Sequence, residues 1–226
     1  GAFWEFGSPD WERTKLFMIF GVAEDHDSNP IKMGLSRLKE RGAKVVAVNP
    51  VRTGYNAIAD EWVSITPGTD GLFVLALIHE LFTAGKIDLD YLIRYTNAPW
   101  LVVDEADSDE HGLFLRDKDG TPQVIERTTG TVAAIDKKGV KPDLKGFVKT
   151  KEGRKAVPVF MKMAETYMDK AYAPDSVAEV TGVSAAQIKA IAAELARVAF
   201  DEEIVIDQPW TDFKGETHDK MIGRPV

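Results

Sequence analysis

Residues 43–70 read AKVVAVNPVRTGYNAIADEWVSITPGTD. Residues 45–48 form a near-continuous apolar run, which is typical of a parallel strand covered on both faces, and the run ends at residues 49–50, Asn-Pro. A second strand is expected over residues 62–66, and residues 68–70 then begin a long helix with a threonine as its candidate N-cap. Backbone N–H groups at a helix start attract anions, so this stretch predicts a place where an open α/β sheet binds a ligand with phosphates and a polar base.

The flanking residues repeat the order of strand and helix. Residues 15–21 predict a first buried strand that ends in a glycine, and residues 28–42 predict a helix opened by a capping serine and a proline. Residues 69–86 are apolar around most of a helical circumference, which indicates a helix largely buried on the sheet. These elements predict a βαβ unit, a connection that is almost always right-handed.

The chain changes character after a further expected strand at residues 99–103. Residues 104–156 indicate hairpins and loops, with a turn at residues 118–120, Lys-Asp-Gly. Helical spacing returns at residues 157–170, and residues 184–187, SAAQ, form a capping box ahead of one apolar stripe.

The sequence therefore predicts an α/β fold, a Rossmann-like parallel sheet flanked by helices with a β-hairpin and loop insertion. We expect residues 1–103 to be the first part of an α/β dinucleotide-binding domain and residues 104–156 to be the insertion. Residues 157–226 are expected to be the helical return, with a further strand of the same α/β region at residues 203–207.

Composition limits the function classes. The 226 residues include 36 acidic and 28 basic ones, a formal net charge of −8, which argues against a nucleic-acid partner because phosphates need clustered lysine and arginine. The absence of cysteine excludes disulfides and cysteine-ligated clusters within these residues. No apolar run approaches the roughly 18 to 20 residues of a membrane span. Because the chain begins without methionine, we expect it to be a piece of a longer protein.

The loop after the first strand, GVAEDHDSN at residues 21–29, is acidic and lacks the glycine-rich fingerprint of NAD enzymes. Carboxylates at Glu24, Asp25 and Asp27 would repel a pyrophosphate, but they suit the N1–H and N2 amine of guanine. The loop is therefore either a guanosine contact or a solvated acidic turn.

The turn after the second strand carries further ligand-binding side chains. Arg52 can pair with a phosphate as a fork of donors, Thr53 adds a hydroxyl, and Asn49 lies where a ribose or base contact is expected. Asp70 has the alternative role of a favourable charge in the first turn of a helix.

Four blocks of the chain, in this order and spacing, resemble the molybdopterin oxidoreductase family of the dimethyl sulfoxide reductase type. They are VVAVNPVRT (45–53), AIADEWVSITPGTDGLFVLALIHEL (57–81), IDLDYLIRYTNAPWLV (87–102) and VTGVSAAQIKAIAAELA (180–196). Within that family, GLFLRD (112–117) followed by PDLKGF (142–147) and PVF (158–160) is most similar to the branch of thiosulfate and polysulfide reductases and sulfite dehydrogenases.

The resemblance implies that this chain is an internal fragment of a molybdenum oxidoreductase catalytic subunit, inactive alone, acting on a small, sulfur-containing substrate. It implies bis(molybdopterin guanine dinucleotide) with molybdenum, and one guanine dinucleotide arm bound by Gly21, Val22, Ala23, Asp25, His26, Ser28, Asn29, Asn49, Pro50, Arg52, Thr53, Gly68, Thr69 and Asp70. No catalytic residue and no metal ligand is expected within these residues.

The remaining implications concern parts outside the sequence. The family's metal ligand and a 4Fe-4S cluster are expected upstream, in the N-terminal part. The expected partners are the rest of the catalytic chain, an iron–sulfur electron-transfer subunit, and also a membrane anchor subunit. The expected compartment is the cytoplasm, with the periplasm as the alternative.

Two positions depart from the family pattern. Family members usually carry aspartate where this chain has Asn49, and many carry asparagine where it has Ala23. Two other classes of protein stay open: a non-catalytic nucleotide-binding domain, such as the central domain of thiamine diphosphate enzymes, and an interaction module that binds no ligand.

Overall fold

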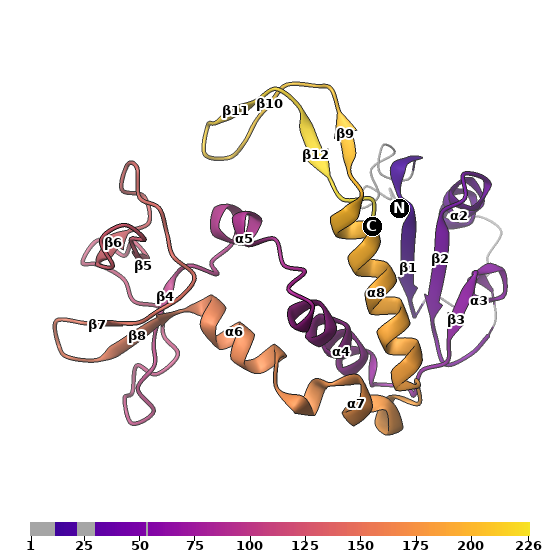
Figure 1. Ribbon diagram of the computed structural model, residues 1–226, viewed down its shortest axis with the longest axis horizontal. Helices are drawn as coiled ribbons and strands as arrows, with labels where there is room; N and C mark the ends of the chain where they lie inside the picture. Colours follow the sequence, from indigo (N-terminus) through magenta and orange to yellow (C-terminus); the bar gives the residue numbers. More distant parts are fainter. Residues whose placement is uncertain (1–11, 22–29, 53) are drawn as a thin grey trace. The chain divides into compact units, whose positions relative to one another are not determined.

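The computed structural model describes residues 12–21, 30–52 and 54–226 (Figure 1). The chain divides into two compact units, one made of Gly1–Lys86 with Lys170–Val226 and one made of Ile87–Asp169. Separate sheets and separate clusters of buried residues hold the two units. The segments 1–103, 104–156 and 157–226 stay a prediction.

The first unit contains a parallel sheet of three strands in the order β1-β2-β3. The strands are β1 (Leu16–Phe20), β2 (Lys44–Val48) and β3 (Glu61–Val63). Helix α2 (Pro30–Glu40) connects the first two strands, and the short α3 (Tyr55–Ile58) connects the next two. The predicted α/β fold with a helix-flanked parallel sheet is therefore confirmed.

Both faces of this sheet are covered, which explains the apolar run in β2. Val46 and Val48 lie in one buried cluster with residues of α4 (Asp70–Thr83), α7 (Pro174–Thr181) and α8 (Ala185–Asp201). Val45 and Ala47 lie in the other, with Leu35 and Leu38 of α2. Alternate side chains of a strand point to opposite faces, so two covered faces require an unbroken apolar strand. Figure 1 shows α8 along the sheet and α4 beside α8.

Helix α8 begins as the sequence predicts, but only half of the capping box forms. The backbone N–H of Gln187 donates to Ser184 Oγ at 3.2 Å, which satisfies one first-turn donor. The Gln187 side chain instead donates to Glu61 Oε1 at 3.2 Å. This contact ties the start of α8 to β3. The 3-10 helix η1 (Lys170–Tyr172) precedes α7.

The second unit is built from antiparallel strands and two helices. Strands β4 (Leu101–Val103), β8 (Lys155–Pro158) and β7 (Val148–Lys149) form one sheet, and β5 (Gln123–Ile125) pairs with β6 (Val132–Ala134). The helices are α5 (Leu89–Tyr95) and α6 (Val159–Tyr167). The expected turn at residues 118–120 is present, because Gly120 N donates to Asp117 O at 3.0 Å. Leu101, Ile125, Val148 and Ala156 form the buried cluster.

The C-terminal part contains two small antiparallel pairs. Strand β9 (Ile204–Ile206) pairs with β12 (Met221–Gly223), and β10 (Trp210–Thr211) pairs with β11 (Thr217–His218). The strand expected at residues 203–207 therefore exists, but its partner is β12 and not the parallel sheet. Among the described helices, none has the length and apolar character needed to cross a membrane.

Candidate functional site

The three parallel strands end level with one another. Phe20 pairs with Val48, and Val48 pairs with Val63. One residue further on, Gly21 N donates to Val48 O at 3.0 Å and Asn49 N donates to Val63 O at 3.0 Å. The turns that follow β1, β2 and β3 therefore leave the sheet at the same edge. In open α/β sheets, ligands bind outside this carboxyl end of the strands.

The start of α4 lies beside the end of β1. The ring centroids of Phe20, the last residue of β1, and Phe73, in the first turn of α4, are 6.3 Å apart. Phe73 is fully buried in the core cluster, so this contact fixes the helix start. We call Gly21, residues 49–52 and residues 68–70 together the strand-end edge.

Hydrogen bonds to the backbone shape the turn after β2. Asn49 is only 4% exposed, and its Oδ1 accepts from Val51 N at 3.1 Å. Asn56, 1% exposed, donates from Nδ2 to Val51 O at 2.9 Å, and Trp62 Nε1 donates to Asn49 O at 2.9 Å. The Arg52 guanidinium lies 5.7 Å from the centre of the Trp62 ring. The turn thus holds an exposed arginine above an indole.

The loop before α4 leaves the helix start open. Thr69 is the N-cap residue, as predicted, but its hydroxyl donates to Thr66 O at 2.8 Å and makes no capping bond to the helix. The first-turn amides have no acceptor within the helix, so they present N–H groups beside the carboxylate of Asp70. Gly68 has φ +83°, and a Cβ placed on it would meet nothing within 4 Å among the described residues. Within this part of the chain, the backbone at Gly68 is therefore open.

Charges at the two ends of the sheet are arranged differently. Asp60 precedes β3 at the opposite end and accepts from Lys39 Nζ at 2.7 Å and Val45 N at 2.8 Å. Burial raises the pKa of Asp60, but these hydrogen bonds outweigh it and the pKa lies below its ordinary value. Arg52 and Asp70 make no ion pair within the described ranges 12–21, 30–52 and 54–226. Among the described residues, the charges at the strand-end edge are thus unpaired, whereas Asp60 at the other end is paired with Lys39.

Half of the predicted site residues lie in the described structure. Those on the strand-end edge are Gly21, Asn49, Pro50, Arg52, Gly68, Thr69 and Asp70. Outside the described residues lie Val22, Ala23, Asp25, His26, Ser28, Asn29 and Thr53. Asn56 and Trp62 also shape this edge, and neither was predicted from the sequence. The sequence signal for Asn56 is a single polar residue in the otherwise apolar stretch 55–59. The structure shows that this asparagine is buried.

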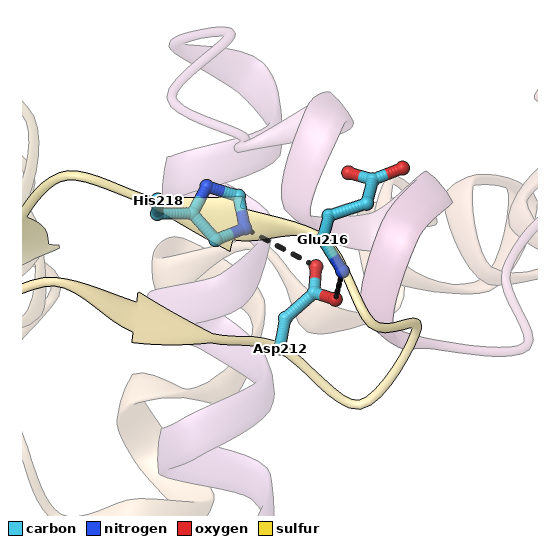
Figure 2. A group of neighbouring side chains, drawn as sticks. All are labelled: Asp212, Glu216 and His218. Atoms are coloured by element: carbon cyan, nitrogen blue, oxygen red, sulfur yellow. Dashed lines mark hydrogen bonds and ion pairs between the residues drawn. The ribbon is translucent and has the colours of Figure 1, made fainter.

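A second polar cluster lies in the hairpin of β10 and β11 (Figure 2). Asp212 Oδ1 accepts from Lys214 N and Glu216 N, both at 2.9 Å, and His218 Nε2 lies 3.3 Å from Asp212 Oδ2. The His218 ring stacks on Trp210 with centroids 4.7 Å apart. Figure 2 shows the Glu216 side chain leading away from Asp212. These bonds account for the cluster as the brace of a tight hairpin turn.

Comparison with known proteins gives relatives along the whole chain. No protein-family model matches it. The A subunit of sulfite dehydrogenase from Allochromatium vinosum is 41% identical over 235 aligned residues, which cover 100% of this chain and 24% of that protein. The A subunit of tetrathionate reductase from Archaeoglobus fulgidus is 30% identical over 80% of this chain and 18% of its own length.

A third relative is the catalytic A subunit of the putative dimethyl sulfoxide reductase from Halobacterium salinarum, 28% identical over 83% of this chain and 22% of its own length. The chain belongs to the molybdopterin oxidoreductase family of the dimethyl sulfoxide reductase type. The family resemblance found in four blocks of sequence is thereby confirmed. The chain spans about a quarter of the length of the first of these family members.

A solved structure agrees with the fold. Acetylene hydratase from Pelobacter acetylenicus has a TM-score of 0.50 over 85% of this chain and 18% of that chain, at 17% sequence identity. At this identity the likeness concerns the fold alone.

Proposed function

We propose that this chain is part of the catalytic subunit of a molybdopterin-dependent oxidoreductase, and that its strand-end edge binds one guanine nucleotide arm of bis(molybdopterin guanine dinucleotide). The observation that carries the proposal is the level ending of β1, β2 and β3, which gathers Gly21, Asn49 and the loop before α4 at one edge. The names of the family members support a redox function.

The donors and acceptors at the edge fit such a ligand. Arg52 is an exposed fork of donors for a phosphate with no ion pair among residues 12–21, 30–52 and 54–226, and the open start of α4 adds backbone donors. Asp70 offers an acceptor for a ribose hydroxyl or a guanine N–H. The buried Asn56 Oδ1 has no hydrogen-bond partner in the part of the chain that the structure describes, which is consistent with a polar group completing this turn.

The described residues hold and orient the ligand in this proposal. Asn49 and Asn56 fix the turn that carries Arg52, and Phe73 fixes the helix start that carries Asp70. When bound, the molybdenum cofactor supplies the redox chemistry on a small, sulfur-containing substrate. We assign no catalytic residue and no metal ligand within the chain.

The rest of the protein completes the proposal. The metal ligand and a 4Fe-4S cluster come from other segments of the same protein, and an iron–sulfur subunit with a membrane anchor accepts or supplies the electrons. The names of the relatives, which designate single subunits, support the presence of partner subunits. The proposed compartment is the cytoplasm.

The test measures cofactor content in the full-length protein. Arg52→Ala and Asp70→Ala each remove a charge-assisted hydrogen bond, which typically costs about 1.5 to 3 kcal/mol, or roughly ten- to a hundredfold in affinity. We expect both variants to lose molybdenum, measured by elemental analysis, together with the guanine nucleotide released by acid.

The matched controls are Arg37→Ala, on the exposed side of α2, and Asp175→Ala, a first-turn acid of α7 whose side chain is 74% exposed. Both controls should keep the cofactor. Full occupancy in Arg52→Ala and Asp70→Ala would remove the strand-end edge from the site, and an adenine base in the extract would favour the nucleotide-binding domain of another class.

A further inference from the structure

The loop that precedes α4 is hydrogen-bonded at Thr66 to a turn that is distant in the sequence. The backbone N–H of Thr66 donates to the carbonyl oxygen of Thr181, which is the last residue of α7, at 2.8 Å. Thr181 is fully buried, and its hydroxyl donates to Val177 O at 2.9 Å while accepting from Val183 N at 3.3 Å. The acceptor for Thr66 is therefore held rigidly by the turn between α7 and α8.

Gly182 meets two requirements at this turn. It ends α7 in the left-handed conformation with φ +71°, which disfavours any residue with a Cβ. A Cβ placed on it would also lie 3.1 Å from Thr66 Oγ1. Gly42, which follows α2 with φ +81°, is also in the left-handed region, yet a Cβ there would meet no described residue within 4 Å.

Thr66 transmits any displacement to the start of α4. Its carbonyl oxygen accepts from Thr69 N at 3.2 Å and from Thr69 Oγ1 at 2.8 Å, and Thr69 O in turn accepts from Phe73 N at 3.0 Å. A shift of the Thr66 backbone would therefore reach Thr69, the N-cap residue of α4.

We propose that Gly182 is a positioning residue for the nucleotide site, because the α7–α8 turn sets the place of Thr66 and, through it, the backbone donors of residues 68–72. This inference rests on the proposed function. Since a misplacement of about 1 Å costs on the order of a hundredfold in a positioned site, a shift of a few tenths of an ångström should cost roughly three- to tenfold.

The experiment compares two glycine substitutions in the full-length protein. Gly182→Ala and Gly42→Ala both force a side chain into the left-handed region, so we expect a similar fall in melting temperature. Only Gly182→Ala adds a contact with Thr66, so only it should weaken cofactor retention by roughly three- to tenfold. The readouts are molybdenum and guanine per protein chain after dialysis.

Rescue separates positioning from general damage. Thr66→Ala removes the atom that the new Cβ meets, so the double variant Thr66→Ala/Gly182→Ala should regain the cofactor while keeping the lowered melting temperature. If Gly182→Ala does not fold, the pair Gly182→Asn and Gly42→Asn replaces the alanine pair, because asparagine tolerates the left-handed region and still carries a Cβ.

The outcomes distinguish the two proposals. Cofactor retention in Gly182→Ala equal to that in Gly42→Ala, or no rescue by Thr66→Ala, overturns the positioning role while Arg52→Ala and Asp70→Ala still lose the cofactor. Retention in all of these variants overturns the proposed site itself.

Discussion

Two polar residues directly follow buried strands in this chain, and their surroundings differ. Asn49 follows β2, and its side-chain oxygen accepts a hydrogen bond from the turn that it begins. Asp104 follows β4 and is bound by Lys155 Nζ at 2.7 Å and Lys162 Nζ at 3.2 Å. The hydrogen bonds from Lys155 and then Lys162 hold the pKa of Asp104 below its ordinary value.

The difference between the two positions comes from strand direction. In the parallel sheet, all carboxyl ends meet at one edge, so polar turns gather there, and Arg52 and Asp70 have no ion-pair partner among the described residues. In the antiparallel sheet, β8 runs back beside β4 and brings its own lysine to Asp104. In this chain, the polar residue after a buried strand contacts a lysine of the returning strand in the antiparallel sheet, and its own turn in the parallel sheet.

The largest expected effect concerns the core beneath the strand-end edge. Phe73→Ala empties a fully buried position in the first unit, which should cost about 3 to 5 kcal/mol. Hydrogen exchange followed by mass spectrometry should show faster exchange of the β2 amides, with the β4 amides unchanged. Leu101→Ala, in the core of the second unit, should do the reverse.

The control for both core substitutions is Phe147→Ala, because Phe147 is 62% exposed and its removal should change neither set of amides. Equal acceleration of β2 and β4 amides by Phe73→Ala would mean that the two units do not open separately.

A smaller effect is expected at the turn after β2. Asn49 is nearly buried but the turn after it is exposed, so Asn49→Leu loses one part-buried hydrogen bond to Val51 N and should lower the free energy of unfolding of the first unit by about 1 to 1.5 kcal/mol. Asn49→Asp keeps an oxygen at the same place and should preserve this stability at neutral pH. Urea unfolding measures both. Equal losses in the two variants would show that the Val51 hydrogen bond does not stabilise the turn.

The smallest expected effect is pH dependent and belongs to the second unit. A carboxylate whose pKa is lower in the folded protein stabilises the fold above its unfolded pKa, and the contribution is lost as the pH falls through the folded pKa. Asp104→Asn should therefore lower stability by about 1 kcal/mol at pH 7, and the difference from the parent protein should shrink as the pH falls below the unfolded pKa of about 3.9.

Exchange of the β4 amides over this pH range checks the Asp104 prediction, with Asp107→Asn at an exposed loop position as the control. A difference that does not shrink as the pH falls below about 4 would contradict the assigned cause. Cofactor content should not change in Asp104→Asn, in contrast to Asp70→Ala.

The sequence was most informative for a strand that is buried on both faces and for a helix whose N-cap residue is evident. The unbroken apolar run of β2 and the serine before α8 predicted those elements, because both patterns have few alternatives. For residues 99–103 the sequence predicted a strand but not its pairing. An apolar run fits a parallel or an antiparallel strand equally well, and the partner strand β8 lies more than 50 residues further along the chain. Strands β10, β11 and β12 are two or three residues long, too short to show a period.

In the candidate site, too, local features could be predicted from the sequence and contacts between distant residues could not. The types of residues at 49–53 and 68–70 indicated a polar edge, since turn chemistry is local. The roles of Trp62 and Gly182 depend on contacts with turns that are distant in the sequence. Contacts of this kind follow from tertiary packing and have no local sequence pattern.

The central claim is that three turns at one sheet edge hold a guanine nucleotide. The most direct test is a structure of the full-length protein with its cofactor bound, determined by cryo-electron microscopy. The account predicts a guanosine group against Asn49 and Asp70, with a phosphate within hydrogen-bond distance of Arg52. A cofactor bound elsewhere, with protein side chains packed against this edge in its place, would contradict it.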